Sequence, residues 1–220
     1  MITTAPRPST APEHALDALR RAIAGGELRP GQRIPQEEVA EALGVSVAPV
    51  REALRVLEQE GQVRYYPRRG YFVTELRVAD LEEIYGLRRL LEERAARHAL
   101  PALDRERLGR IELAARDCEL SADRGDVAAE LQANRRFHLA ILQAEDQPHT
   151  LRVISLLWDS TEAYRAMYYN SPDERRRSVR AHQRILAALR SGDADRLVAE
   201  LDRHRNRGLA VLRSILSQAA

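Results

Sequence analysis

The sequence contains no lysine, so all 35 of its basic side chains are arginine, a bias that we attribute to coding rather than to chemistry. Its single cysteine, Cys118, excludes a disulfide within the chain and is typical of a protein of the reducing cytoplasm. No apolar run is long enough to span a membrane. Residues 1–10 lack the apolar segment of a secretory signal, and we expect them to form a flexible arm.

The chain also lacks a large excess of charge of either sign. Its formal net charge is +2, and within residues 1–75 the arginines equal the acidic residues in number. Binding to nucleic acid would therefore depend on where individual arginines are placed, not on bulk charge. A length of 220 residues, with 44% hydrophobic and 31% charged residues, is ordinary for a water-soluble chain of two compact domains.

A capped helix follows the turn at residues 44–46. Ser46 is a favourable N-cap, and Pro49 lies in the first turn, where its missing N–H has no helical partner. An i, i+4, i+7 spacing gives one apolar stripe, made of Val50, Leu54 and Leu57. Small and cationic residues lie on a different face: Ala48, Arg51 and Arg55. A short helix with such a face suits the major groove of DNA.

A β-hairpin is predicted after Gly61, with residues 68–70 (Arg-Arg-Gly) at its tip. Upstream, one apolar stripe ends at two glycines, residues 25–26, and a second short helix begins after Pro35. Helix, helix, turn, helix and hairpin in this order predict a winged helix-turn-helix over residues 11–75. Each arginine taken alone is more simply a solvated surface residue. The set within the motif favours DNA contact: Arg51, Arg55, Arg64, Arg68 and Arg69.

Residues 15–74 resemble the DNA-binding domain of the GntR family of bacterial transcription regulators. The matching segments, in order, are Leu28-Arg29-Pro30-Gly31, residues 38–46, residues 49–54, residues 57–61 and residues 69–73. The family usually has Arg-Thr after the turn serine, whereas this chain has Val47-Ala48, which removes one expected base-reading arginine. We assign DNA contact to Ser46, Ala48, Arg51, Arg55, Arg68, Arg69 and Gly70.

Beyond residue 76 the β pattern disappears and amphipathic helical patterns take its place. Helices are predicted from about 81 to Pro101, over 105–122 and 127–144, from Pro148 past Tyr164, from Pro172 to Arg190, and over 197–215. Short connections between long amphipathic helices predict an antiparallel all-α bundle over residues 76–220. The fold class is therefore mostly α, with a small β-hairpin in the N-terminal domain.

Residues 78–215 resemble the FCD effector domain of the FadR subfamily of the GntR family. The matching segments are residues 88–97, residues 134–138 (Asn-Arg-Arg-Phe-His) and residues 182–193. The resemblance implies a helical bundle that dimerises and binds a small effector, often a carboxylic acid. It also implies a metal, which many members hold through one Asp and three His. This chain has Asn134 where the subfamily usually has Asp.

Four polar residues lie on the apolar stripes of their helices: Asn134, His138, His182 and His204. Each histidine alone is more simply a hydrogen-bonded core or surface residue. Three inward imidazoles from three helices are costly unless paired, however, and together they favour a metal site. Neutral imidazole suits zinc or nickel, and Asn134 would add one neutral oxygen.

Arg88 falls on the first arginine of the subfamily's helix motif. We expect it either to grip a carboxylate effector through its guanidinium or to be an exposed residue in a salt bridge with Glu92, at i+4. Four further residues are candidates for lining a pocket or, alternatively, for packing in the core: Trp158, Tyr164, Arg165 and Tyr168.

The sequence thus predicts a cytoplasmic, ligand-responsive transcription regulator and not an enzyme. We expect a homodimeric repressor that an organic acid releases from its double-stranded DNA operator. One alternative is a metal-dependent hydrolase built on the bundle, although no acid or base motif accompanies the histidines. Another is a winged helix that serves only protein contacts.

Overall fold

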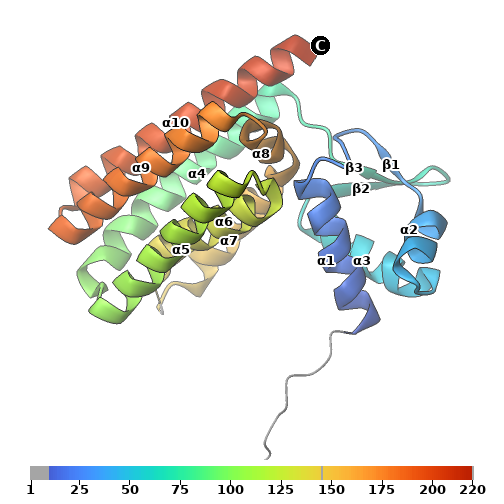
Figure 1. Ribbon diagram of the computed structural model, residues 1–220, viewed down its shortest axis with the longest axis horizontal. Coiled ribbons are helices and arrows are strands. Elements are labelled where there is room, and N and C mark those ends of the chain that lie inside the picture. Colours follow the sequence, from blue (N-terminus) through green and yellow to red (C-terminus); the bar gives the residue numbers. More distant parts are fainter. Residues whose placement is uncertain (1–9, 145, 220) are drawn as a thin grey trace, which may run out of the picture.

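The computed structural model describes residues 10–144 and 146–219. It confirms a mostly α fold, with a small winged domain beside a bundle of long helices (Figure 1). The predicted flexible arm lies outside the described residues except for Thr10. The side chain of Thr10 accepts a hydrogen bond from the Glu13 amide and so caps the first helix.

The winged domain is built from three helices and three short strands. The helices are α1 (Ala11–Ala24), α2 (Gln36–Leu43) and α3 (Val47–Gln59), and the strands are β1 (Arg33–Ile34), β2 (Val63–Tyr66) and β3 (Gly70–Val73). The strands form an antiparallel sheet in the order β1-β3-β2. Gly44 ends α2 at a φ of 65°, in the left-handed region that favours glycine, and so turns the chain into α3.

The periodicity of α3 correctly predicted which of its faces is buried. Val50, Leu54 and Leu57 lie in the core of the winged domain, together with Leu19 and Ile23 of α1. The opposite face of α3 is left to solvent. Ser46 has the extended backbone of an N-cap, but its side chain makes no capping hydrogen bond, so its cap is weaker than expected.

The bundle follows without further strands in the described part of the chain. Its elements are α4 (Val78–Ala99), a 3-10 turn η1 (Leu100–Ala102), α5 (Arg105–Arg124), α6 (Val127–Leu142), α7 (Pro148–Asp159), α8 (Glu162–Tyr169), α9 (Pro172–Ser191) and α10 (Ala194–Ala219). The core includes Phe137, Ile154 and Ile185. Cys118 is 1% exposed in this core, and burial raises its thiol pKa to about 12.

The sequence predicted one helix from Pro148 past Tyr164, and this was wrong: the structure has two helices. Between α7 and α8, the Ser160 hydroxyl donates to the Leu157 carbonyl (3.0 Å) and the Thr161 hydroxyl to the Trp158 carbonyl (3.1 Å). Side-chain hydroxyls that bind nearby backbone oxygens compete with the helical pattern. The break changes the direction of the chain after α7, so that α8 runs towards α1 and packs against it (Figure 1).

Helix α8 belongs to both halves of the molecule. Ala163 packs against the core of the winged domain, while Tyr164 lies in a cluster with Leu81, Leu131 and Leu212 of the bundle. Ala24, from α1, is buried in the same cluster. None of the helices among the described residues is both long enough and apolar enough to cross a bilayer.

Candidate functional site

The exposed face of α3 and the tip of the hairpin carry the predicted DNA-binding residues. Six of them are exposed: Ser46, Ala48, Arg51, Arg55, Arg68 and Arg69. Gly70, the seventh, is partly buried at the start of β3, with φ 90°. Arg64, on β2, is exposed as well. The structure therefore displays the whole set to solvent on α3 and the hairpin, apart from the backbone position at Gly70.

The hairpin tip is held by contacts that the sequence did not reveal. Arg33, on the short strand β1, donates from Nε to the Arg69 carbonyl oxygen at 3.1 Å. The Arg69 guanidinium lies 5.2 Å from the centre of the Phe72 ring, a distance typical of cation–π contact. On α3, Arg51 Nε donates to Gln36 Oε1 at 3.4 Å, which links this helix to α2.

The three predicted histidines converge inside the bundle. His138, His182 and His204 come from α6, α9 and α10, and one ligand nitrogen of each lies within 4.8 Å of those of the others. The rings of His138 and His204 are stacked, with centroids 5.0 Å apart. His138 and His182 are buried, and His204 is partly buried. The sequence thus correctly predicted that these side chains face one another.

The donor set of this cluster fits a divalent transition metal. Four buried ring or amide atoms have no hydrogen-bond partner among the described residues: Asn134 Oδ1, His138 Nε2, His182 Nδ1 and His182 Nε2. Burial and neighbouring imidazoles hold the pKa values of His138 and His182 well below the usual one, and burial with Arg88 lowers that of His204 to about 4. The imidazoles are therefore neutral at pH 7, the form that binds metal.

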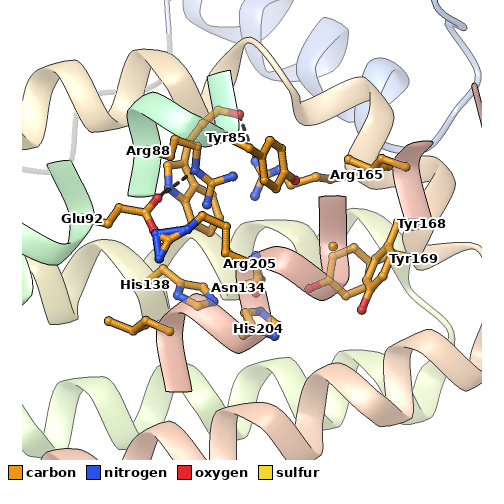
Figure 2. A pocket seen from close by; sticks show the side chains of 14 residues that line it. Tyr85, Arg88, Glu92, Asn134, His138, Arg165, Tyr168, Tyr169, His204 and Arg205 are labelled. Carbon is orange, nitrogen blue, oxygen red and sulfur yellow. Dashed lines mark hydrogen bonds and ion pairs between the residues drawn. The ribbon is translucent and has the colours of Figure 1, made fainter. Parts of the chain in front are cut away.

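Beside the histidines, a buried ion network surrounds Glu92. Glu92 Oε1 accepts from Arg88 Nε and from Trp158 Nε1, both at 2.8 Å, and Glu92 Oε2 accepts from Arg205 Nη1 at 3.3 Å. Burial alone would raise the Glu92 pKa, but the two guanidinium groups lower it, so the carboxyl is ionised. Figure 2 shows Arg88, Glu92 and Arg205 close together, with Tyr168 and Tyr169 at the other end of the view.

The network tests one of the two expectations for Arg88, the exposed salt bridge with Glu92; binding of a carboxylate effector by Arg88 stays a prediction. Arg88 does pair with Glu92, but it is 4% exposed, so the expectation of an exposed salt bridge was wrong. Both residues line one pocket with His138 and His204. Sequence reasoning missed Arg205, because its partner Glu92 lies 113 positions away and only the packing of α10 on α4 brings them together.

The pocket is small and mixes aromatic with charged walls. Its volume is about 40 Å³, room for a few water-sized groups. Of the four further candidates, Trp158, Arg165 and Tyr168 line it, whereas Tyr164 points into the neighbouring core. Arg88 and Arg165 lie 4.1 and 4.3 Å from the centre of the Trp158 ring. The indole therefore lies against two cations and donates its N–H to Glu92.

An exposed helix-and-wing surface joined to a helical bundle with a polar pocket defines a DNA-binding transcription regulator with an effector domain. Comparison with known families gives the same class. Residues 12–73 match the gntR family of bacterial regulatory proteins, and residues 83–207 match the FCD domain. The chain belongs to the GntR family and, by its FCD domain, to the FadR subfamily.

Curated relatives and solved structures agree with this assignment. The chain is 26% identical to YdhC, an uncharacterised helix-turn-helix transcriptional regulator of Bacillus subtilis, over 91% of this chain and 90% of YdhC. It is 29% identical to the transcriptional regulator McbR of Escherichia coli, over 80% of this chain and 81% of McbR. A solved structure of E. coli McbR superposes with a TM-score of 0.81 at 26% identity, covering 94% of this chain and 99% of that one. These are non-enzymatic regulators, so the hydrolase alternative has no support.

Proposed function

We propose that this regulator is a repressor that leaves its operator when a small organic acid binds in the bundle pocket. The observation that carries the proposal is that one helix, α8, lines this pocket and also packs on the winged domain. A relative in E. coli, 24% identical over 84% of this chain and 82% of its own, is named the transcriptional repressor RspR. That name supports repression rather than activation here.

The route from pocket to DNA runs through α8. Arg165, Tyr168 and Tyr169 line the pocket, while Ala163 of the same helix packs against the winged domain. Tyr164 adds a hydrogen bond to the segment that joins the domains. Since α8 is only eight residues long, a ligand that displaces its pocket face also displaces the face against α1.

A divalent metal is part of the proposal. His138, His182 and His204 would hold it, with Asn134 as a fourth, neutral donor, and zinc or nickel suits this nitrogen-rich set. When bound, such an ion supplies positive charge that attracts a carboxylate. The chain's own residues then orient the effector, because Trp158 and Tyr85 form apolar walls of the pocket and Arg88 is fixed by Glu92.

We also propose that the protein acts as a homodimer. One winged helix contacts few base pairs, so readers of this kind pair across a two-fold axis to bind both half-sites. Helices α4 and α7 pack together and expose large apolar side chains on the bundle surface: Leu87, Leu90, Val153 and Leu156. Such a cluster on a soluble bundle is suited to burial against a second copy.

The test of the proposed function begins with the purified protein and fragmented bacterial DNA. Sequencing the retained fragments identifies an operator, and fluorescence anisotropy on that operator gives the affinity. Specific binding that a carboxylate weakens is the expected result. Absence of any DNA shift at low salt would instead support a winged helix that serves only protein contacts. A carboxylate that tightens the complex would overturn the release mechanism.

A further inference from the structure

The tip of the wing contains a backbone conformation that arginine rarely adopts. Arg68 has a φ of 63°, and it is the one non-glycine residue with a positive φ in the part of the chain that the structure describes. The Arg69 amide donates to the Tyr66 carbonyl oxygen at 3.0 Å, so Arg68 is the second central residue of a β-turn. A positive φ at that position normally belongs to glycine or asparagine, because a larger side chain crowds the backbone there. The turn therefore holds Arg68 in a strained conformation.

No contact within the described residues explains why this strained position carries arginine. The Arg68 side chain is exposed, and it makes no hydrogen bond or ion pair with any residue that the structure describes. The tip also points away from the bundle (Figure 1). Backbone strain persists only where the surrounding residues impose it, and it is typical of functional sites. An exposed guanidinium in such a turn is suited to contact a DNA phosphate.

Arg33 restrains the tip from outside the hairpin. It lies on β1, and its Nε donates at 3.1 Å to the carbonyl oxygen of Arg69, the residue directly after the strained one. Arg33 is paired with Phe72 across the sheet, so the two side chains lie on the same face. The Arg69 guanidinium lies 5.2 Å from the centre of the Phe72 ring and 5.9 Å from that of Tyr66. The residue after Arg68 is therefore held through both its backbone and its side chain.

We infer that Arg33 is a positioning residue for DNA binding: by holding the Arg69 carbonyl, it keeps the tip in the left-handed turn that presents the Arg68 side chain to DNA. Among the described residues, it is the one side chain outside residues 63–73 that hydrogen-bonds the backbone of residues 67–70. A tip that is already ordered loses less conformational freedom on binding, which raises affinity. The inference uses DNA binding alone, so it is independent of the proposed repression and effector.

A double-mutant cycle separates positioning by Arg33 from a direct contact with DNA. Wild type, Arg33→Met, Arg68→Ala and the double variant are titrated into fluorescent operator and unrelated DNA at several salt concentrations. Arg33→Met alone should weaken binding to both DNAs about three- to tenfold, because the tip is no longer ordered before it binds. In the Arg68→Ala background, the same change should alter affinity by less than about twofold, since the positioned side chain is already absent.

Other roles for Arg33 give other patterns. If Arg33 contacts a phosphate itself, its removal should cause the same fold loss in both backgrounds and lower the salt slope further in the double variant. If Arg33 only stabilises the fold, its removal should lower the melting temperature and leave DNA affinity unchanged. Either pattern overturns the inference.

Arg29→Met is the matched control for the loss of one positive charge. Arg29 is an exposed arginine of the same domain, but it lies beside α8 and α10 and not at the tip. This variant should bind operator and unrelated DNA like the wild type. A loss equal to that of Arg33→Met would assign the effect to net charge and overturn the inference.

Replacement of Arg68 by glycine tests the strained turn separately. Arg68→Gly and Arg68→Ala both lack the guanidinium, but only alanine keeps the Cβ that crowds a left-handed backbone. Arg68→Gly should therefore melt at a higher temperature than Arg68→Ala, while both bind DNA more weakly than the wild type. Equal melting temperatures, or wild-type DNA affinity in either folded variant, would overturn the inference.

Discussion

The Tyr164 hydroxyl accepts a hydrogen bond from the Leu76 amide at 2.6 Å. Tyr164 is 1% exposed on α8, and Leu76 lies between β3 and α4, in the connection between the two domains. This bond therefore joins a helix that lines the bundle pocket to the backbone that connects the winged domain to α4.

Removing that link should separate effector binding from DNA release. Tyr164→Phe leaves the ring and removes the acceptor, so we expect a loss of about 1 kcal/mol in the free energy of unfolding by urea. Carboxylate affinity should persist while its effect on operator affinity becomes smaller. The matched control is Tyr65→Phe on the exposed face of β2, which should change stability little. A full effector response in Tyr164→Phe would count against this route.

The helix and the wing should contribute differently to DNA binding. Arg51→Ala should weaken binding to the operator by about 1–3 kcal/mol, the usual worth of an arginine contact to a base edge. Fluorescence anisotropy with operator and unrelated DNA measures the difference. If Arg51→Ala binds operator as tightly as the wild type, α3 does not lie in the major groove with Arg51 at a base edge.

The tip of the wing should act on all DNA sequences alike. Arg68 is exposed there, and its removal takes away one cation near the phosphates. Arg68→Ala should weaken operator and unrelated DNA similarly and lower the slope of log affinity against log salt by about 1. A change confined to the operator would assign a base contact to Arg68 instead.

The metal proposal has a thermal and an elemental test. A chelator should lower the melting temperature, because an ion bound only by the folded state stabilises it, by about 2.7 kcal/mol at a hundredfold excess over Kd. His182→Ala should abolish the chelator effect, and Asn134→Asp should tighten metal binding by adding a charge. Protein without transition metal by elemental analysis, and without a shift on adding zinc or nickel, would rule the site out.

The dimer proposal places the interface on α4 and α7. Leu90 is 61% exposed on α4 and Leu156 is 42% exposed on α7. The double change to arginine should turn a dimer into a monomer by light scattering, because it introduces two charges where apolar side chains would be buried. Leu113→Arg on α5, at 60% exposure, is the control and should remain dimeric. A wild-type monomer at micromolar concentration would refute the proposal.

Stability should fall as pH rises through neutrality, owing to Glu130. Burial raises the pKa of this carboxyl to about 8, and Arg175, at 3.9 Å, only partly offsets the burial. The folded state then holds the proton more tightly than the unfolded chain, whose pKa is near 4.5. The stabilisation is complete below pH 4.5 and is lost between pH 4.5 and 8, by on the order of a few kcal/mol. Glu130→Gln should flatten that decline in urea unfolding.

Periodicity predicted most of the fold because burial follows the helical repeat. It predicted that Val50, Leu54 and Leu57 lie in the core and that His138 and His182 point inward, and all five residues are buried. It did not reveal β1, because two residues are too few to show a repeat. It also did not reveal the break at Ser160 and Thr161, where the hydroxyl bonds of individual side chains outweigh the pattern.

The candidate site was only partly predictable for a related reason. An inward histidine is visible as a polar residue on an apolar stripe. The ion network is not, since Glu92, Arg88 and Arg205 meet through the packing of separate helices, and a charged residue on a helix usually lies in water. Arg165 was recognised as a pocket candidate, but the lack of hydrogen-bond partners for its buried Nε and Nη1 is a property of the assembled structure.

Because Cys118 is buried, the protein is suited to distance measurements between spin labels attached to an introduced cysteine. A thiol that is 1% exposed, with a pKa of about 12, does not react with maleimide or methanethiosulfonate labels while the bundle is folded. A cysteine introduced at exposed Gln59, at the end of α3, would be the sole reactive thiol on each chain. Spin labels there would report the distance between the two recognition helices of a dimer, with and without carboxylate, in otherwise native protein.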